Sequence, residues 1–244
     1  MDIQTYLKNR QKMKFAEDSL RVLCSRCLQS PVTCYCSAVK KVDTNIEFVI
    51  LIHPIEVRRR IATGRMAYLC LQDSHLISGE DYTHHSEVNA LLTDSRYHSV
   101  ILYPGEDSLN LSNLSEAERS EVSPPNKKLR VFVIDGTWAT AKKMIRKSGN
   151  LSQLPRICFT PEKVSTFRVR RQPHPHCYST IEAIHQTIEL LGVSSGFDVS
   201  CRQHDQLLQV FDQMVEKQLQ FVRESYAKSG KDPLSRERRK LVGV

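Results

Sequence analysis

The feature that most constrains the fold is a set of short apolar runs that alternate with helical patterns along the chain. Strands are predicted at residues 46–52, 100–103, 129–134 and 156–159. Helices are predicted at residues 56–71, 86–93, 137–147 and 180–191. The strand runs are nearly continuous in apolar residues, which is typical of strands that are buried on both faces of a parallel sheet. The sequence therefore predicts an α/β fold with helices on both faces of a parallel sheet.

The rest of the chain divides around that α/β pattern. Residues 1–40 are predicted to form a short helix and a cysteine-containing module, residues 41–200 the main domain, and residues 201–244 an amphipathic helix with a basic tail. The helix is predicted because apolar residues recur at helical spacing in Leu207, Phe211, Met214, Val215, Leu219 and Val222. A short extended piece is expected near residues 75–77. Residues 105–128 are acidic, rich in Ser and Asn and contain two adjacent prolines, so a mobile insertion is expected there.

Four of the eight cysteines fall within 13 residues, as Cys24, Cys27, Cys34 and Cys36. Zinc prefers four soft ligands in a tetrahedron, and a Cys-x2-Cys turn supplies two of them. The alternative, four buried free cysteines, does not explain the clustering. The spacing therefore predicts a zinc site, and because the protein fills all four positions, its role is expected to be structural.

Charge and hydropathy narrow the functional class. The net charge is +8, and residues 127–171 alone contain twelve basic and two acidic residues. Such a field attracts polyanions, although a solvated basic face without a partner is an alternative. No run approaches the roughly 20 apolar residues of a membrane span, and the first residues lack a secretory pattern. A cytoplasmic protein with no membrane association and reduced cysteines is expected, and no obligate protein partner is indicated.

Asp135-Gly136-Thr137-Trp138 lies where a predicted strand ends and a predicted helix begins. Ligands of parallel α/β proteins bind at the carboxyl ends of strands, and a helix N-terminus offers free N–H groups. Asp135 is one of only two acids in the basic stretch. Its position allows two hypotheses: an N-cap of the following helix, or an acid with a catalytic task.

These residues resemble the DTW-domain family. The resemblance rests on Asp135-x-Thr137-Trp138 behind the four cysteines, together with three further blocks in the same order. The blocks are His53-Pro54-x-Glu56 with Thr63-Gly64, then Arg168-x-Arg170, then Ser179-Thr180-Ile181-Glu182-Ala183. The resemblance covers residues 22–222, and its motifs are specific in combination. Ala62 departs from the Asn that is common before Thr-Gly, which puts a hydrogen bond from that side chain in doubt.

The resemblance implies a SPOUT-like, knotted fold and a tRNA-uridine aminocarboxypropyltransferase. Such an enzyme transfers the 3-amino-3-carboxypropyl group of S-adenosylmethionine to N3 of a tRNA uridine and releases 5′-methylthioadenosine. Analogy points to a uridine of the variable loop. A SPOUT-like RNA methyltransferase and a non-catalytic, zinc-containing RNA-binding protein remain as alternatives.

The site residues follow from the residues and the resemblance together. Asp135 is the expected catalytic residue, as a base for N3–H or as a group that holds the uracil ring. Cofactor contacts are expected from Gly136, Thr137, Trp138, Thr180 and Glu182, although Ser179 and Glu182 also fit a simple helix cap. RNA contacts are expected from Arg168, Arg170 and Arg171. The proline-flanked His174 and His176 are expected in an RNA-contacting loop.

Overall fold

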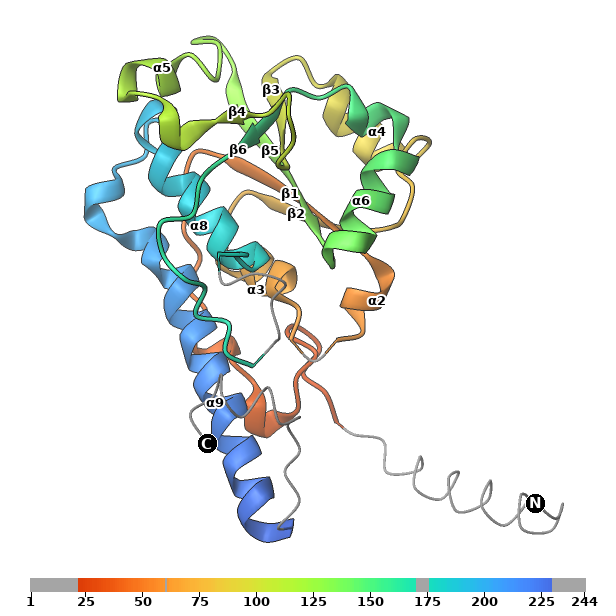
Figure 1. Cartoon of the computed structure of the whole chain (residues 1–244), viewed down its shortest axis with the longest axis vertical. Helices are drawn as coiled ribbons and strands as arrows, with labels where there is room; N and C mark the ends of the chain where they lie inside the picture. Colours follow the sequence, from red (N-terminus) through yellow and green to blue (C-terminus); the bar gives the residue numbers. More distant parts are fainter. Residues whose placement is uncertain (1–21, 60, 170–175, 230–244) are drawn as a thin grey trace, which may run out of the picture.

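A computed structural model describes residues 22–59, 61–169 and 176–229. The short helix that the sequence predicts ahead of the cysteines, over residues 1–22, lies almost wholly outside the described residues. The basic tail, Arg170, Arg171 and His174 also lie outside them. The described chain is built on a six-stranded sheet of order β2-β1-β5-β3-β6-β4, in which every pair of neighbouring strands is parallel (Figure 1). The predicted parallel α/β class is confirmed.

The six strands include all four predicted from apolar runs. Their bounds are β1 (Glu47–Ile52), β2 (Ser74–Ser78), β3 (Tyr97–Leu102), β4 (Leu109–Asn110), β5 (Lys128–Asp135) and β6 (Arg156–Cys158). β5 lies at the centre between β1 and β3, and all six residues of β1 are buried. The extended piece expected near residues 75–77 is a full edge strand, β2, paired along β1.

Helices cover both faces of the sheet, as predicted (Figure 1). One face packs on α3 (Thr63–Cys70), α8 (Thr180–Leu191) and α9 (Gln206–Ser229), which share a core with Phe48, Val131 and Val133. The other face packs on α4 (Ser86–Thr93), α6 (Trp138–Lys147) and α7 (Gly149–Ser152), around Val49 and Phe132. Successive strand residues alternate between the two cores, so both faces of each strand are apolar.

The prediction of one continuous helix over residues 56–71 is wrong, because the structure has two separate helices there. The chain forms a short helix, α2 (Pro54–Val57), and then starts a new helix, α3, at Thr63. The Arg65 guanidinium donates to the Val57 carbonyl at 3.3 and 3.4 Å, which ties the end of α2 to the second helix. The break brings the N-terminus of α3 to the end of the central strand, a placement that local sequence pattern cannot encode.

The expectation of a mobile insertion over residues 105–128 is corrected. That segment contains β4, the 3₁₀ helix η3 (Leu111–Asn113) and α5 (Glu116–Ser120). Ser115 and Glu118 form a capping box at the start of α5, and Leu111 is fully buried. The segment therefore extends the sheet edge and contributes to the core.

The cysteine segment packs against α9 through two 3₁₀ helices, η1 (Pro31–Thr33) and η2 (Cys36–Ala38). Lys217 Nζ donates to the Cys34 carbonyl at 2.8 Å, and Gln206 Nε2 donates to the Ala38 carbonyl at 2.7 Å. Cys27 and Tyr35 are buried in the same core as α9. Among the described helices, none combines the length and apolarity needed to cross a bilayer.

Candidate active site and metal centre

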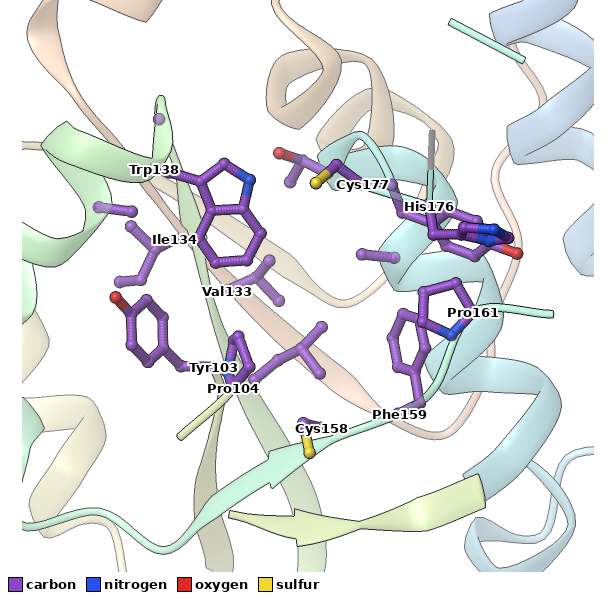
Figure 2. Close-up of a pocket in the computed structure, with 16 residues that line it drawn as sticks. Tyr103, Pro104, Val133, Ile134, Trp138, Cys158, Phe159, Pro161, His176 and Cys177 are labelled. Carbon is purple, nitrogen blue, oxygen red and sulfur yellow. The ribbon is translucent and has the colours of Figure 1, made fainter. Parts of the chain in front are cut away.

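A cavity of about 290 Å³ lies at the carboxyl ends of three adjacent strands, β5, β3 and β6. This is the edge at which parallel α/β proteins bind ligands. Figure 2 shows Trp138 and Tyr103 on one side of the cavity and Phe159 and Pro161 on the other. The described lining residues are Leu102, Tyr103, Pro104, Val133, Ile134, Gly136, Trp138, Ala141, Cys158, Phe159, Pro161, His176, Cys177, Tyr178, Thr180 and Ala183.

The wall of the cavity is largely apolar and aromatic. The Phe159 and Tyr178 rings pack at a centroid distance of 5.7 Å, and Trp138 keeps 48 % of its surface exposed at the start of α6. Gly136 allows the chain to turn tightly there, because a Cβ at this position would lie 2.6 Å from Thr140 Oγ1. Such a wall suits a flat, partly apolar ligand with a few polar groups.

Asp135 is the last residue of β5 and is 4 % exposed. Its Oδ1 accepts a hydrogen bond of 2.5 Å from the Thr180 hydroxyl at the start of α8. Its carbonyl accepts from the His53 amide at 2.9 Å, which joins the ends of β1 and β5. The N-cap of α6 is Thr137, whose side chain accepts from the Thr140 amide at 3.2 Å. The hypothesis that Asp135 caps α6 is therefore wrong.

Gly64, in the first turn of α3, lies directly against the Asp135 carboxyl group. A Cβ on Gly64 would lie 2.5 Å from Asp135 Oδ2 and 2.7 Å from Cγ, closer than real side chains approach. The glycine thus lets the helix N-terminus, with its partial positive charge, come up to the buried carboxylate. The Thr63-Gly64 block and Asp135 therefore belong to one site.

Glu182 is 7 % exposed, and its carboxylate links the start of α8 to the segment around Ser165 and Thr166. It completes a capping box with Ser179, whose amide and hydroxyl donate to Oε2 at 2.7 and 2.6 Å. It also accepts from the Ser165 hydroxyl at 2.8 Å and from the Thr166 amide at 2.8 Å. Through these hydrogen bonds the Glu182 carboxylate fixes residues 165–166 against the N-terminus of α8.

The structure brings together most of the predicted cofactor-binding residues. Gly136, Trp138 and Thr180 line the cavity, whereas Thr137 and Glu182 are not among its described lining residues and serve as caps. Sequence reasoning missed the aromatic residues Tyr103, Phe159 and Tyr178. His176, which was expected in an RNA-contacting loop, lies in the cavity wall next to Cys177, which sequence reasoning missed. The signal that could have found Tyr103 and Phe159 was their position, since each is the last residue of a predicted strand and follows directly after β3 or β6 in the structure.

The basic residues of the stretch 127–171 include a group of exposed cations on α6 and an arginine that is paired with an acid of α9. Four exposed cations project from α6, the helix that begins at the cavity with Trp138: Lys142, Lys143, Arg146 and Lys147. Lys143 and Lys147 lie 3.7 and 3.3 Å from Glu80. Arg168 forms a short ion pair with Glu216 on α9, so part of its charge is neutralised within the protein. Arg170 and Arg171 are outside the described residues.

The four predicted zinc ligands converge. The Sγ atoms of Cys24 and Cys36 are 3.7 Å apart, those of Cys27 and Cys34 are 3.6 Å apart, and all four lie within 4.8 Å of one another. Zinc–sulfur bonds of about 2.3 Å in a tetrahedron place the sulfurs about 3.8 Å apart. Backbone hydrogen bonds from Cys27 and Arg26 lower the pKa of Cys24 to about 6, whereas burial raises the pKa of Cys27 and of Cys36. The convergence of the four sulfurs, rather than the pKa of any one thiol, therefore carries the assignment. The geometry fits a zinc ion.

Comparisons with known proteins give related sequences but no solved structure that matches. The chain is 27 % identical over 175 residues to tRNA-uridine aminocarboxypropyltransferase 2 of Drosophila melanogaster, covering 69 % of this chain and 66 % of the relative. It is 24 % identical over 225 residues to the Mus musculus protein of the same name, covering 89 % and 73 %. It is 24 % identical over 186 residues to tRNA-uridine aminocarboxypropyltransferase A of Arabidopsis thaliana, covering 67 % and 70 %.

The chain thus spans about two thirds to three quarters of the length of these relatives. The DTW domain model matches residues 21–219, a range that contains the four cysteines, the buried Asp135, the aromatic cavity and most of α9. The chain belongs to the DTW domain family.

Proposed function

We propose that this protein is a tRNA-uridine aminocarboxypropyltransferase that uses S-adenosylmethionine. The observation that carries the proposal is the buried Asp135–Thr180 pair beside an aromatic cavity, in a chain of the DTW family. The printed names of the related proteins support the reaction class. The products are a 3-(3-amino-3-carboxypropyl)uridine in tRNA and 5′-methylthioadenosine.

The cavity has the features that the donor requires. Trp138, Tyr103 and Phe159 offer faces for a purine ring, and the apolar wall suits the thioether product. The N-termini of α6 and α8 open at the cavity through Gly136 and Thr180, and the free N–H groups of a helix start bind carboxylates. These residues account for an aromatic end and a polar end of one ligand.

In the reaction, uracil N3 loses its proton and forms a bond to the γ-carbon of the methionyl chain. The bond between that carbon and the sulfonium breaks, and its electron pair stays on sulfur to give a neutral thioether. The protein must therefore orient N3 in line with the carbon–sulfur bond and accept a proton near the cavity. Charge is lost at sulfur as the bond breaks, and a dry apolar wall favours that change.

Asp135 and Thr180 are proposed to orient uracil N3 and to accept its proton. Thr180 lines the cavity, and its hydroxyl donates to the Asp135 carboxylate. With its proton directed to Asp135, the Thr180 oxygen presents its lone pairs to a donor, such as the uracil N3–H. Asp135 then receives the proton through Thr180 or holds Thr180 in place. Thr180→Ser keeps the hydroxyl and is expected to stay active, whereas Thr180→Val has nearly the same shape and is expected to lose turnover.

The exposed basic face of α6 is proposed to hold tRNA phosphates, together with the predicted Arg168, Arg170 and Arg171. The helix starts at the cavity and carries four cations within two turns, so a bound backbone would lie beside the reacting uridine. Lys142→Ala with Arg146→Ala is expected to weaken tRNA binding and reduce its salt dependence. Lys127→Ala with Lys128→Ala, at the opposite end of β5, is the matched control with little expected effect.

The by-product of a single-turnover reaction tests the function directly. Purified protein, S-adenosylmethionine and unmodified tRNA are expected to give 5′-methylthioadenosine and a tRNA nucleoside heavier by the aminocarboxypropyl group. S-adenosylhomocysteine would show a methyltransferase instead. Binding of tRNA with no product from the donor would show an RNA-binding protein without this activity.

We also propose that Cys24, Cys27, Cys34 and Cys36 bind one structural zinc ion. All four positions would be filled by protein, which leaves no open site for chemistry. Cys24→Ser is expected to lower the melting temperature strongly and to leave turnover per folded molecule nearly unchanged. Four thiols that react freely in the native protein, with no bound metal, would contradict this site.

A SPOUT-like, knotted topology is proposed as the finer description of the fold. After β6 the chain runs past the cavity and enters α8, which packs back on β5 and α3, on the far side of the sheet from α6. The position of α8 across the sheet from α6 supports the proposal that the chain end is threaded through an earlier loop. An experimental structure that traces residues 159–180 and forms no trefoil when the ends are extended would contradict it.

A further inference from the structure

A second cluster of metal-ligating side chains lies apart from the four cysteines, where α8 meets the 3₁₀ helix η6 (Gln203–Asp205). His185 and Glu189 lie one turn apart on α8, and His204 and Asp205 come from η6. One donor atom from each of the four lies within 4.8 Å of all the others. We propose that this cluster is a second zinc-binding site, which joins α8 to the start of α9.

The separations of the donor atoms are close to those around a tetrahedral ion. His185 Nε2 is 2.8 Å from Asp205 Oδ1 and 3.8 Å from Glu189 Oε1. His204 Nε2 is 3.0 Å from Glu189 Oε1 and 4.0 Å from Asp205 Oδ1. Nitrogen and oxygen ligands at about 2.0–2.2 Å from zinc are about 3.3–3.6 Å apart, so small side-chain shifts complete the site. Two imidazoles and two carboxylates are a donor set that zinc accepts.

His204 is the residue that points to a ligand. Its side chain is fully buried, and neither ring nitrogen makes a hydrogen bond of acceptable geometry among the described residues. The ring stacks on His185 at 4.8 Å between centroids and meets the edge of Phe197 at 5.6 Å. His204 Nε2 faces the Glu189 carboxylate at 3.0 Å without good hydrogen-bond geometry. A buried nitrogen that lacks a well-formed hydrogen bond is costly, and a bond from Nε2 to zinc would satisfy it.

Arg202 competes for the same ligands. One guanidinium nitrogen lies 2.6 Å from Asp205 Oδ1 and 2.6 Å from Glu189 Oε1, the two oxygens that face the histidines. The backbone of Arg202 has a φ of 54°, a left-handed conformation that L-residues rarely adopt and that is held here beside η6. Its side chain is half exposed, so it can turn into solvent when an ion binds. Arg202 therefore sets the affinity of the site.

The site would stabilise the helix that supports the cavity. Thr180, which binds Asp135, begins α8, and His185 follows about 7.5 Å further along the same helix. An ion shared by α8 and η6 fixes the helix along its axis, which fixes Thr180. The site is thus a clamp on α8 rather than a second reaction centre.

The test is a calorimetric titration of full-length protein, already loaded with one zinc per chain at the cysteines, with further zinc. One additional equivalent is expected to bind and to raise the melting temperature. His204→Phe, which keeps the buried ring, is expected to abolish that event, and Glu189→Gln to weaken it. Arg202→Gln is expected to increase the affinity severalfold. Glu216→Gln, another carboxylate paired with an arginine, is the matched control.

Cobalt distinguishes the two sites by their ligands. Cobalt bound to the four thiolates gives strong sulfur-to-metal charge-transfer absorption, whereas cobalt at the second site is expected to add only weak ligand-field bands. Those bands should disappear in His204→Phe while the charge-transfer absorption persists. The proposal is overturned if neither the natural protein nor Arg202→Gln binds a second equivalent. It is also overturned if His204→Phe binds that equivalent unchanged.

Discussion

The neighbouring strands β1 and β5 together place buried charged residues at both ends of the pair, and these residues have different partners at the two ends. At the amino end, Glu47 is paired in register with Arg130, whose side chain is 2 % exposed. Arg130 Nε donates to Glu47 at 2.7 Å, and its guanidinium lies 3.7 Å above the Tyr97 ring. At the carboxyl end, Asp135 is paired in register with Ile52 and is held by Thr180 and the start of α3.

The amino ends of β1 and β5 therefore contribute mainly to stability, and we expect the carboxyl ends to contribute mainly to the reaction. The amino end matches a buried acid with a full cation in hydrogen-bonding geometry, so both charges are satisfied within the fold. The carboxyl end holds its acid with a hydroxyl and a helix N-terminus, beside a cavity that is open to a ligand. We therefore expect substitutions at the amino end to change the free energy of unfolding, and substitutions at the carboxyl end to change turnover.

The largest expected effect is at the amino end. Arg130→Met leaves Glu47 buried without its main cation and is expected to lower the free energy of unfolding by about 3–5 kcal/mol. The measurement is denaturant unfolding monitored by circular dichroism. The double variant Glu47→Leu with Arg130→Met removes both charges and should recover much of the loss. Equal loss in the single and double variants would show that packing around Tyr97, rather than charge pairing, stabilises this end.

Next in size is the effect of Asp135→Asn at the carboxyl end. Asn keeps the shape and an acceptor for Thr180 but lacks a basic oxygen, so single-turnover formation of 5′-methylthioadenosine should fall about a hundredfold. The melting temperature and the affinity for tRNA should change little. Normal turnover in this variant would remove Asp135 from the chemistry and make the two strand ends alike.

Gly64→Ala sharpens the comparison without changing a charge. The new methyl group would meet the Asp135 carboxyl, so the Thr180 hydrogen bond must lengthen, and we expect overpacking to cost about 1–3 kcal/mol, shared between stability and turnover. Gly149→Ala, in open space at the start of α7, is the matched control. If Gly64 acts through Asp135, the effects of Gly64→Ala and Asp135→Asn on turnover should be less than additive.

The smallest expected effect concerns pH. The hydrogen bond to Glu47, at 3.1 Å, raises the pKa of His75 above its usual value. A raised pKa in the folded state stabilises below the unfolded pKa of about 6.5, and this contribution is lost as the pH rises through the folded value. Because His75 is about one third exposed, we expect at most about 1 kcal/mol.

His75→Gln is therefore expected to flatten the loss of stability just above neutral pH. The measurement is the melting temperature across that range, and His84→Gln, at an exposed position, is the control. If the pH dependence of the melting temperature is unchanged in His75→Gln, the buried Glu47 charge is stabilised by Arg130 and not by His75.

Much of this architecture is visible in the sequence because it depends on local repetition. The apolar run that forms β1 predicts a buried strand, since every residue there must face one of two cores. The four cysteines predict a shared metal site, because a Cys-x2-Cys turn presents two thiols together and a second closely spaced pair completes a tetrahedral set. The amphipathic spacing from Leu207 to Leu219 likewise predicts the helix that became α9.

Only the tertiary structure decided which distant residues meet. Thr180 lies 45 positions from Asp135, and Gly64 is more than 70 positions away, yet both contact its carboxyl group. The aromatic wall likewise joins Tyr103, Phe159 and Tyr178, which follow or precede different elements. The sequence alone could name Asp135 at a strand end, because strand-to-helix turns are local. Its partners were settled by strand order and helix packing, since these depend on burial summed over the whole chain rather than on any one segment.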